Sequence, residues 1–400
     1  MHDVVIRGGN VVDGSGAPAR VADVAIDGGV ITDVGTDVGA GTREIDATGL
    51  LVTPGFVDVH THYDAQATWD PFLTPSSWHG VTTAVVGNCG VGFAPAAPDK
   101  HEWLIEMMEG VEDIPGAALT EGIQWEWETF PEYLDALDRR EYVLDIGTQV
   151  PHGAVRGYVM GERGAANEEA TADDIGAMAD LVGEGLRAGA LGFSTSRTPL
   201  HKSKSGELVP GTMVDATELY GIADEMSTVG HGVFQFAPEH VILPDQEWTW
   251  MRELATRSGR TVSVNFSQTD QQPDLWKQVI AKLDEDRANG VPIVAQVHGR
   301  TVGLLMCLEG SYHPLMFHPA YQEIADLPLA ERCDALRSGP IRDRLINDVP
   351  DDGGFFERAV LNVTHKIWAV ADGDIDYEPS PDEAVGAVAA QTGTSPMALM

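Results

Sequence analysis

The sequence predicts an α/β protein, a TIM-like β/α barrel of parallel strands that follows a small β-domain. From about residue 53, short apolar segments alternate with longer stretches of helical pattern, which is typical of parallel βαβ units. Side chains able to do chemistry follow the ends of several of these apolar segments, as they do in barrels. Before residue 53, β-rich segments are separated by glycine turns.

Residues 1–52 make up the predicted β-domain, the N-terminal part of a β-sandwich. Asp27-Gly28-Gly29 separates two β-rich segments at 24–26 and 30–34. Asp-Gly and Gly-Gly turns between such segments predict β-hairpins. We assign the remaining residues, 53–400, to the barrel.

Seven apolar segments are predicted strands of the barrel: 55–60, 81–87, 143–149, 189–194, 232–236, 261–267 and 292–297. Helices are predicted at 171–188, 215–229, 246–258 and 273–289. Thr171 is a suitable N-cap for the first helix, with acidic residues in the first turn. A helical segment at 381–391 precedes Met400, and no eighth strand is visible. An open barrel leaves an unpaired edge, so we expect this chain to be a truncated form of a longer one.

The charge is strongly acidic, with 62 Asp and Glu against 25 Lys and Arg and a formal net charge of −37. Nucleic acids and anionic membranes both require a basic surface, so neither is an expected partner. Three cysteines do not make a disulfide framework, and the N-terminus has no signal-peptide pattern. We expect a cytoplasmic protein; homo-oligomerisation is left open.

His60 and His62 lie at the end of the first predicted barrel strand, in Asp58-Val59-His60-Thr61-His62. Residues i and i+2 of an extended segment point to the same side, so both imidazoles can reach one point at the barrel mouth. Such a pair suits a borderline metal ion such as Zn²⁺. The alternative is a pair of surface histidines, but the apolar strand before them favours a metal site.

Cys89 follows the second predicted strand, in Gly87-Asn88-Cys89-Gly90. The flanking glycines permit close approach of the backbone. A thiolate beside two histidines would be a good metal ligand, whereas a free cysteine is commonly an inert buried residue. The residue chemistry leaves both interpretations open.

Five segments form a recognisable set of motifs: Pro54–His62, Tyr63-Asp64-Ala65-Gln66, His79–Thr83, Gly87–Val91 and Gly189–Thr195. In these segments the chain resembles the N-acyl-D-amino-acid deacylase (D-aminoacylase) branch of the amidohydrolase superfamily. The resemblance implies a β/α barrel with a β-sandwich built from both chain ends. It implies hydrolysis of a C–N amide bond, other than a peptide bond, by metal-activated water, with one or two divalent ions such as Zn²⁺.

The resemblance also assigns individual residues. His60 and His62 match the histidine pair of the family, and Cys89 matches its metal-binding cysteine. The proton-shuttling aspartate follows the eighth strand in the family, so we expect it to lie beyond Met400. The family's further metal histidines follow the fifth and sixth strands, where this chain reads 233–237 and 264–268 with no histidine. Gln235 and Gln268 are poor replacements, because neutral carboxamides are weaker ligands for Zn²⁺. His231 and His240 lie near the fifth strand but out of register.

Other side chains are candidates for binding a small amide substrate. His152 and His298 are expected on loops after the third and seventh strands, where they are also the candidates for rebuilding the metal site. His201 and Lys202 are expected on the loop after the fourth. Arginines able to bind a substrate carboxylate are Arg156, Arg197 and Arg300. The alternative is that these groups only hydrogen-bond internally or offset nearby acidic charge. His313 and His318, in a proline-bounded turn, are expected to be structural.

Three functions remain open. The first is a metal-dependent amidohydrolase that deacylates an N-acyl-D-amino acid. The second keeps the barrel and a metal ion but opens a cyclic amide or cleaves a C–C bond, since the histidine set has changed. The third is a non-catalytic barrel that serves as a scaffold or binds a ligand.

Overall fold

The computed structural model describes residues 1–400 except 113, 239–246, 271, 300–302, 311, 349, 351–359 and 371–375. The chain divides into two compact units. The first contains Met1–Val86 and Leu137–Thr148, and the second contains Gly87–Ala136 and Gln149–Met400.

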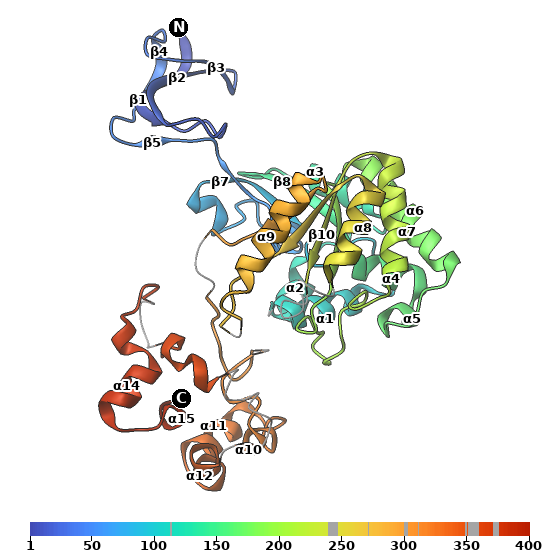
Figure 1. The fold of residues 1–400 in the computed structure, drawn as a ribbon, viewed down its shortest axis with the longest axis vertical. Helices are drawn as coiled ribbons and strands as arrows, with labels where there is room; N and C mark the ends of the chain where they lie inside the picture. The colour runs from blue at the N-terminus through green and yellow to red at the C-terminus, as the bar shows by residue number, and fades with distance from the viewer. Residues whose placement is uncertain are drawn as a thin grey trace. The chain divides into compact units, whose positions relative to one another are not determined.

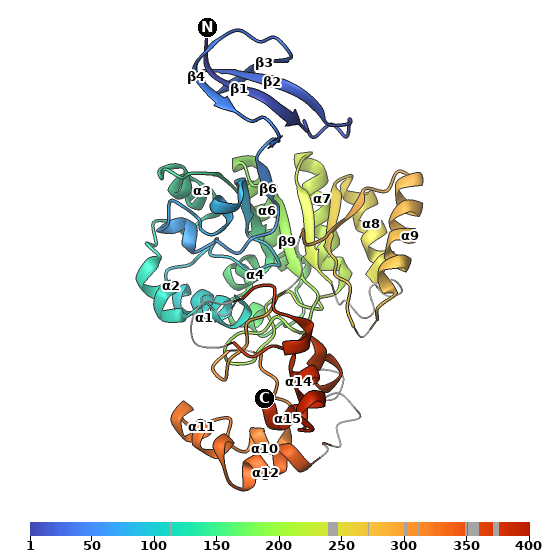
Figure 2. The ribbon, with the colours of Figure 1, turned by 90° about the vertical axis from the view of Figure 1, so that its left-hand side faces the viewer.

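A small five-stranded sheet forms the start of the first unit (Figure 2). Its strands are β1 (His2–Val11), β2 (Arg20–Asp27), β3 (Val30–Gly35), β4 (Gly41–Asp46) and β5 (Leu51–Val52). Their order is β3-β2-β1-β4, and β5 pairs with β1. The predicted glycine turn joins β2 to β3 as an antiparallel hairpin, with Gly28 and Gly29 at φ 56° and 79°. Val5, Ala25 and Val38 form a buried apolar cluster of this sheet.

The second sheet is parallel, seven-stranded and curled like part of a barrel. Its strands lie in chain order: β6 (Phe56–Asp58), β7 (Val81–Val86), β8 (Asp145–Pro151), β9 (Gly192–Ser196), β10 (Val233–Ala237), β11 (Thr261–Asn265) and β12 (Ile293–Gln296). Each overlaps a predicted strand. β9 begins later than predicted because Gly189 ends the preceding helix at φ 127° and two residues then lead into the strand. An eighth strand of this sheet does not occur within the described ranges.

The four predicted helices are present as α6 (Ala172–Ala188), α7 (Ala216–Val229), α8 (Trp248–Ser258) and α9 (Leu275–Ala288). α6 packs against α7, and α7 packs against α8 (Figure 1). Thr171 caps α6 as predicted, because its side chain accepts a hydrogen bond from the Asp174 N–H and the Asp174 carboxylate accepts one from the Thr171 N–H. Apolar side chains of α6, α7 and α8 are buried, among them Met178, Leu219 and Leu254.

Five helices between β7 and α6 were not predicted. They are α1 (His101–Glu112), α2 (Gly116–Gly122), α3 (Phe130–Asp138), α4 (His152–Met160) and α5 (Glu162–Ala165). α4 begins directly after β8, so the expectation that His152 lies on a loop is wrong. Pro151 ends the strand and stands at the N-cap of the helix without an intervening turn. Short 3-10 helices are η1 (Gln66–Thr68), η2 (Ser76–His79), η4 (Leu361–Lys366) and η5 (Pro381–Glu383).

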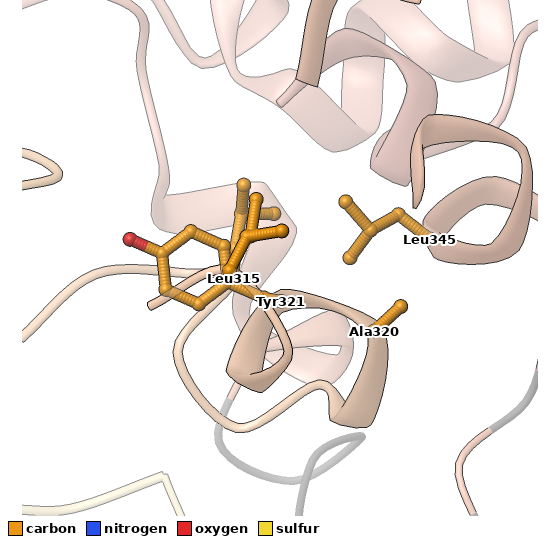
Figure 3. Close-up of a cluster of buried hydrophobic side chains, with 5 residues drawn as sticks. Leu315, Ala320, Tyr321 and Leu345 are labelled. Carbon is orange, nitrogen blue, oxygen red and sulfur yellow. The ribbon is translucent and has the colours of Figure 1, made fainter. Parts of the chain in front are cut away.

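The C-terminal hundred residues contain α10 (Pro319–Gln322), α11 (Leu329–Arg337), α12 (Pro340–Asn347), α14 (Val385–Thr392) and α15 (Pro396–Leu399). Leu315, Ala320, Tyr321 and Leu345 gather in a buried cluster with Ile324 (Figure 3). His313 and His318 are buried here, and each Nδ1 accepts a backbone N–H two residues ahead, in agreement with a structural role. None of the described helices is both long enough and apolar enough to cross a membrane.

Candidate metal centre

His60 and His62 follow β6, and the residue between them fixes their direction. The Thr61 backbone N–H and hydroxyl both donate to the Val85 carbonyl of β7, at 3.0 and 2.8 Å. Because side chains alternate along an extended segment, this turns the two imidazoles to the other side together. Their ring centroids lie 5.3 Å apart at an interplanar angle of 65°. Burial of the His62 ring lowers its pKa to about 4, so the imidazole is neutral at pH 7, the form that binds a metal ion.

Cys89 lies in a tight turn between two glycines, Gly87 and Gly90. Gly87, Cys89 and Gly90 have φ angles of 74°, 56° and 76°, in the left-handed region. A Cβ at Gly87 would stand 2.2 Å from the Gln149 carbonyl oxygen, and one at Gly90 would stand 3.0 Å from the Thr195 Cα. The backbone of the turn therefore lies directly against β8 and β9.

Hydrogen bonds from β9 and α4 hold this turn. The Ser194 hydroxyl accepts from the Gly90 N–H at 2.9 Å and donates to the Gly87 carbonyl, so one side chain bridges the turn. The Gly153 N–H, in the first turn of α4, donates to the Gly90 carbonyl at 2.8 Å. A buried turn whose polar groups are satisfied in this way has a defined position.

Two carboxamides contact Cys89 itself. The Cys89 N–H donates to Gln235 Oε1 at 2.9 Å, and Asn265 Nδ2 donates to Cys89 Sγ at 3.6 Å. The two amides also bind one another, with Gln235 Nε2 donating to Asn265 Oδ1 at 2.9 Å. Gln235 projects from β10 and Asn265 from the last position of β11.

His60, His62 and Cys89 each offer one ligand atom, and the three atoms all lie within 4.8 Å of one another. Two imidazole nitrogens and a thiolate sulfur form a donor set that suits Zn²⁺. The neutral state of His62 is also the state required of a ligand. The residues therefore fit a divalent ion that prefers nitrogen and sulfur.

His152 and Arg156 lie together, but inside the protein. Both are fully buried on α4, and both contact the Glu218 carboxylate of α7. The His152 ring donates to Glu218 through Nε2 at 2.7 Å, and its Nδ1 lies 2.8 Å from the Thr195 hydroxyl. These side chains are occupied by internal partners, so the geometry favours a structural role over the substrate contact predicted for them.

The other predicted substrate contacts are dispersed. His201 is half-buried with Nδ1 at 3.0 Å from the Ser196 hydroxyl, while Lys202 and His298 are exposed. Arg197 pairs with Glu247 and donates to the Val214 carbonyl. His231 is exposed at the residue after the α7 C-cap. Arg300 and His240 lie outside the described residues.

Sequence reasoning missed the roles of Ser194, Asn265 and Glu218. Asn265 is the last residue of β11, where barrels place functional residues, so its position was a usable signal, whereas Ser194 lies in the middle of β9. Their hydrogen bonds to the Cys89 turn span 104 and 176 residues of sequence, which no local pattern reveals. Glu218 lies in the first turn of α7, where an acidic residue is expected for the helix dipole alone.

Comparison with known proteins agrees with the resemblance noted from the sequence. D-aminoacylase and N-acyl-D-aspartate deacylase of Alcaligenes xylosoxydans xylosoxydans are 36% and 35% identical over 48% of this chain. These matches span 37% and 36% of the two relatives. An uncharacterized protein of Mycobacterium tuberculosis is 34% identical over 99% of this chain and 66% of its own length. The chain thus spans less than two thirds of each of these relatives.

Solved structures give the same picture. A crystal structure of D-aminoacylase superposes with a TM-score of 0.61 at 28% identity, over 76% of this chain and 60% of that one. N-acyl-D-glutamate deacylase from Bordetella bronchiseptica, complexed with zinc and a phosphonate inhibitor, gives 0.60 at 27% identity over 75% and 59%. Residues 43–400 match the amidohydrolase family. With its parallel sheet and its histidine pair after β6, the chain belongs to the amidohydrolase family.

Proposed function

We propose that this chain carries the metal centre of a hydrolase that cleaves a C–N amide bond other than a peptide bond, with N-acyl-D-amino acids as its substrate class. The observation that carries the proposal is the group of three ligand atoms, from His60, His62 and Cys89, within 4.8 Å of one another. The names of the deacylases to which the chain is similar support the substrate class.

In this proposal His60, His62 and Cys89 hold a divalent ion, with Zn²⁺ the preferred one. When bound, the ion supplies Lewis acidity, which polarises a carbonyl group and activates water. The chain contributes rigidity: Thr61 sets the direction of the imidazoles, and the turn at 87–90 sets the position of the sulfur. A preorganised ligand set limits the reorganisation needed during the reaction.

An N-acyl amino acid also presents a carboxylate, which needs a cation or hydrogen-bond donors. Arg156 and Arg197 are engaged by Glu218 and Glu247. His201, on the loop after β9, and His298, after β12, remain the proposed contacts for this small-molecule substrate. The net charge of −37 supports the further proposal that neither nucleic acid nor an anionic membrane is a partner.

The test uses the full-length protein loaded with Zn²⁺ and a panel of N-acetyl-D- and N-acetyl-L-amino acids. Hydrolysis of the D-series is expected, and His60→Ala/His62→Ala should lose both bound zinc and activity. His231→Ala, which removes an exposed histidine, is the matched control and should keep both. A histidine-pair variant that keeps metal and activity contradicts the proposal. Bound metal without amide hydrolysis would favour the changed chemistry, and no metal binding would favour a non-catalytic barrel.

A further inference from the structure

We infer that Gln235 and Asn265 are positioning residues of the metal centre, and that together they fix the sulfur of Cys89 for metal binding. The inference rests on the proposed metal site. It concerns four side chains of the second unit: Cys89, Ser194, Gln235 and Asn265.

The backbone of Cys89 requires support from outside its own turn. Its φ of 56° lies in the left-handed region, which residues other than glycine, asparagine and aspartate seldom adopt. Ser194 holds the two glycines of the turn through the Gly90 N–H and the Gly87 carbonyl. The Cys89 N–H is held by Gln235 Oε1, at 2.9 Å and with Gln235 fully buried. Gln235 therefore defines where the cysteine backbone stands.

The orientation of the Gln235 amide then determines that of Asn265. Because Gln235 Oε1 accepts the Cys89 N–H, its NH₂ group must lie on the other side, where it donates to Asn265 Oδ1 at 2.9 Å. Asn265 in turn must direct its own NH₂ group elsewhere, and Nδ2 lies 3.6 Å from Cys89 Sγ. Flipping either amide would place like groups against each other, so the hydrogen-bonded loop has one consistent arrangement.

A donor aimed at a ligand sulfur restricts the rotation of the Cys89 side chain. Groups that hydrogen-bond to metal ligands orient them, and their loss commonly weakens metal binding about 10- to 100-fold. The carboxamides are neutral and poor ligands for zinc, so they support the cysteine without competing for the ion. The fifth and sixth strands of the sheet, near whose ends the resemblance leads one to expect histidine ligands, thus each contribute an amide that serves Cys89 in this chain.

The test measures Co²⁺ binding, since a cobalt–thiolate bond has a charge-transfer absorption that reports directly on the sulfur. Gln235→Leu and Asn265→Leu remove the amides with little change of volume. Gln268→Leu is the matched control, because Gln268 is an exposed amide that follows β11 and donates to the Pro273 carbonyl rather than to Cys89. Affinity is measured by competition with a chelator, and the thermal midpoint of each metal-free variant is recorded alongside.

We expect Asn265→Leu and Gln235→Leu to bind Co²⁺ about 10- to 100-fold more weakly, with a weakened or shifted charge-transfer band, and Gln268→Leu to match the wild type. Wild-type affinity and an unchanged band in both amide variants would overturn the inference. Should Gln235→Leu fail to fold, Asn265→Leu decides alone, because Asn265 is only partly buried. Cys89→Ser distinguishes the proposed metal site from this inference. If Cys89→Ser leaves the charge-transfer band unchanged, the proposed metal site is wrong. If it abolishes the band while the two amide variants keep it unchanged, the metal site stands and only the positioning role of the amides fails.

Discussion

The Glu218 carboxylate binds two buried side chains, His152 and Arg156. Its replacement by glutamine tests how much this buried ion pair contributes to the stability of the fold. Arg156 Nη1 lies 2.7 and 2.5 Å from the two carboxylate oxygens, and His152 Nε2 lies 2.7 Å from Oε1. Arg156 is 0% exposed and Glu218 is 3% exposed. Burial alone would raise the pKa of Glu218, but the His152 hydrogen bond and the Arg156 charge outweigh it, so the pKa is lowered and the group is ionised at neutral pH.

Glu218→Gln keeps the volume and one acceptor but removes the charge that neutralises the Arg156 guanidinium. Breaking a buried ion pair by removing one partner costs about 3–5 kcal/mol, because the other charge stays buried without compensation. Removing both charges, as in Glu218→Gln/Arg156→Met, should restore much of this loss, since a buried pair is often replaceable by uncharged groups. His152 keeps an acceptor in both variants.

The measurement is equilibrium unfolding in urea, followed by far-ultraviolet circular dichroism, for the wild type and each variant. Asp224→Asn is the control on the same helix, because Asp224 pairs with Arg257 at the surface, where an ion pair contributes little. Glu218→Gln should lower the unfolding midpoint far more than Asp224→Asn, and the double variant should lie between Glu218→Gln and the wild type. Equal effects of Glu218→Gln and Asp224→Asn would refute the reasoning.

Three further outcomes are expected. Gly87→Ala should destabilise the chain and weaken metal binding, because its Cβ would stand 2.2 Å from the Gln149 carbonyl oxygen. Gly206→Ala, also at positive φ but with open space around it, should lower the free energy of unfolding less. A larger destabilisation by Gly206→Ala than by Gly87→Ala would contradict the geometry. Metal analysis of the purified chain should find one divalent ion, lost in Cys89→Ser, because the described residues form one group of ligand atoms; two ions would contradict this. The metal-free chain should lose stability as the pH falls from 7 to 5. Burial lowers the pKa of His101, His152 and His313 below the unfolded value of about 6.5, so over this range the unfolded state binds protons that the folded state does not. A free energy of unfolding in urea that stays constant or rises as the pH falls would refute this prediction.

Much of the fold could be predicted because its signals are local. The seven strands of the parallel sheet are short apolar segments, and Thr171 marks the start of α6 by side-chain chemistry alone. α4 escaped prediction because it follows β8 directly, with neither a glycine nor a polar cap between them. The helices of the C-terminal hundred residues are short, and several depend on the apolar cluster around Tyr321 rather than on a long helical pattern.

The candidate site could be predicted only in its sequence-local parts. His60 and His62 are two residues apart at a strand end, so strand geometry places them on one side. What surrounds Cys89 could not be foreseen in the same way. The sequence pointed to Gln235 and Gln268 as poor replacements for missing histidine ligands. Only the assembled strands show that Gln235 and Asn265 both bind Cys89, whereas Gln268 donates to the Pro273 carbonyl.

The hydrogen bonds that hold the Cys89 turn join residues that are 104, 146 and 176 positions apart in the sequence. Contacts of such long range form late, after the loops between them have closed. The turn therefore acquires its shape only when β9, β10 and β11 have come together, and an unfolded chain offers no preformed site. An ion that binds only the folded chain would therefore stabilise the sheet. It would raise the free energy of unfolding by about 2.7 kcal/mol at a free ion concentration one hundred times its Kd.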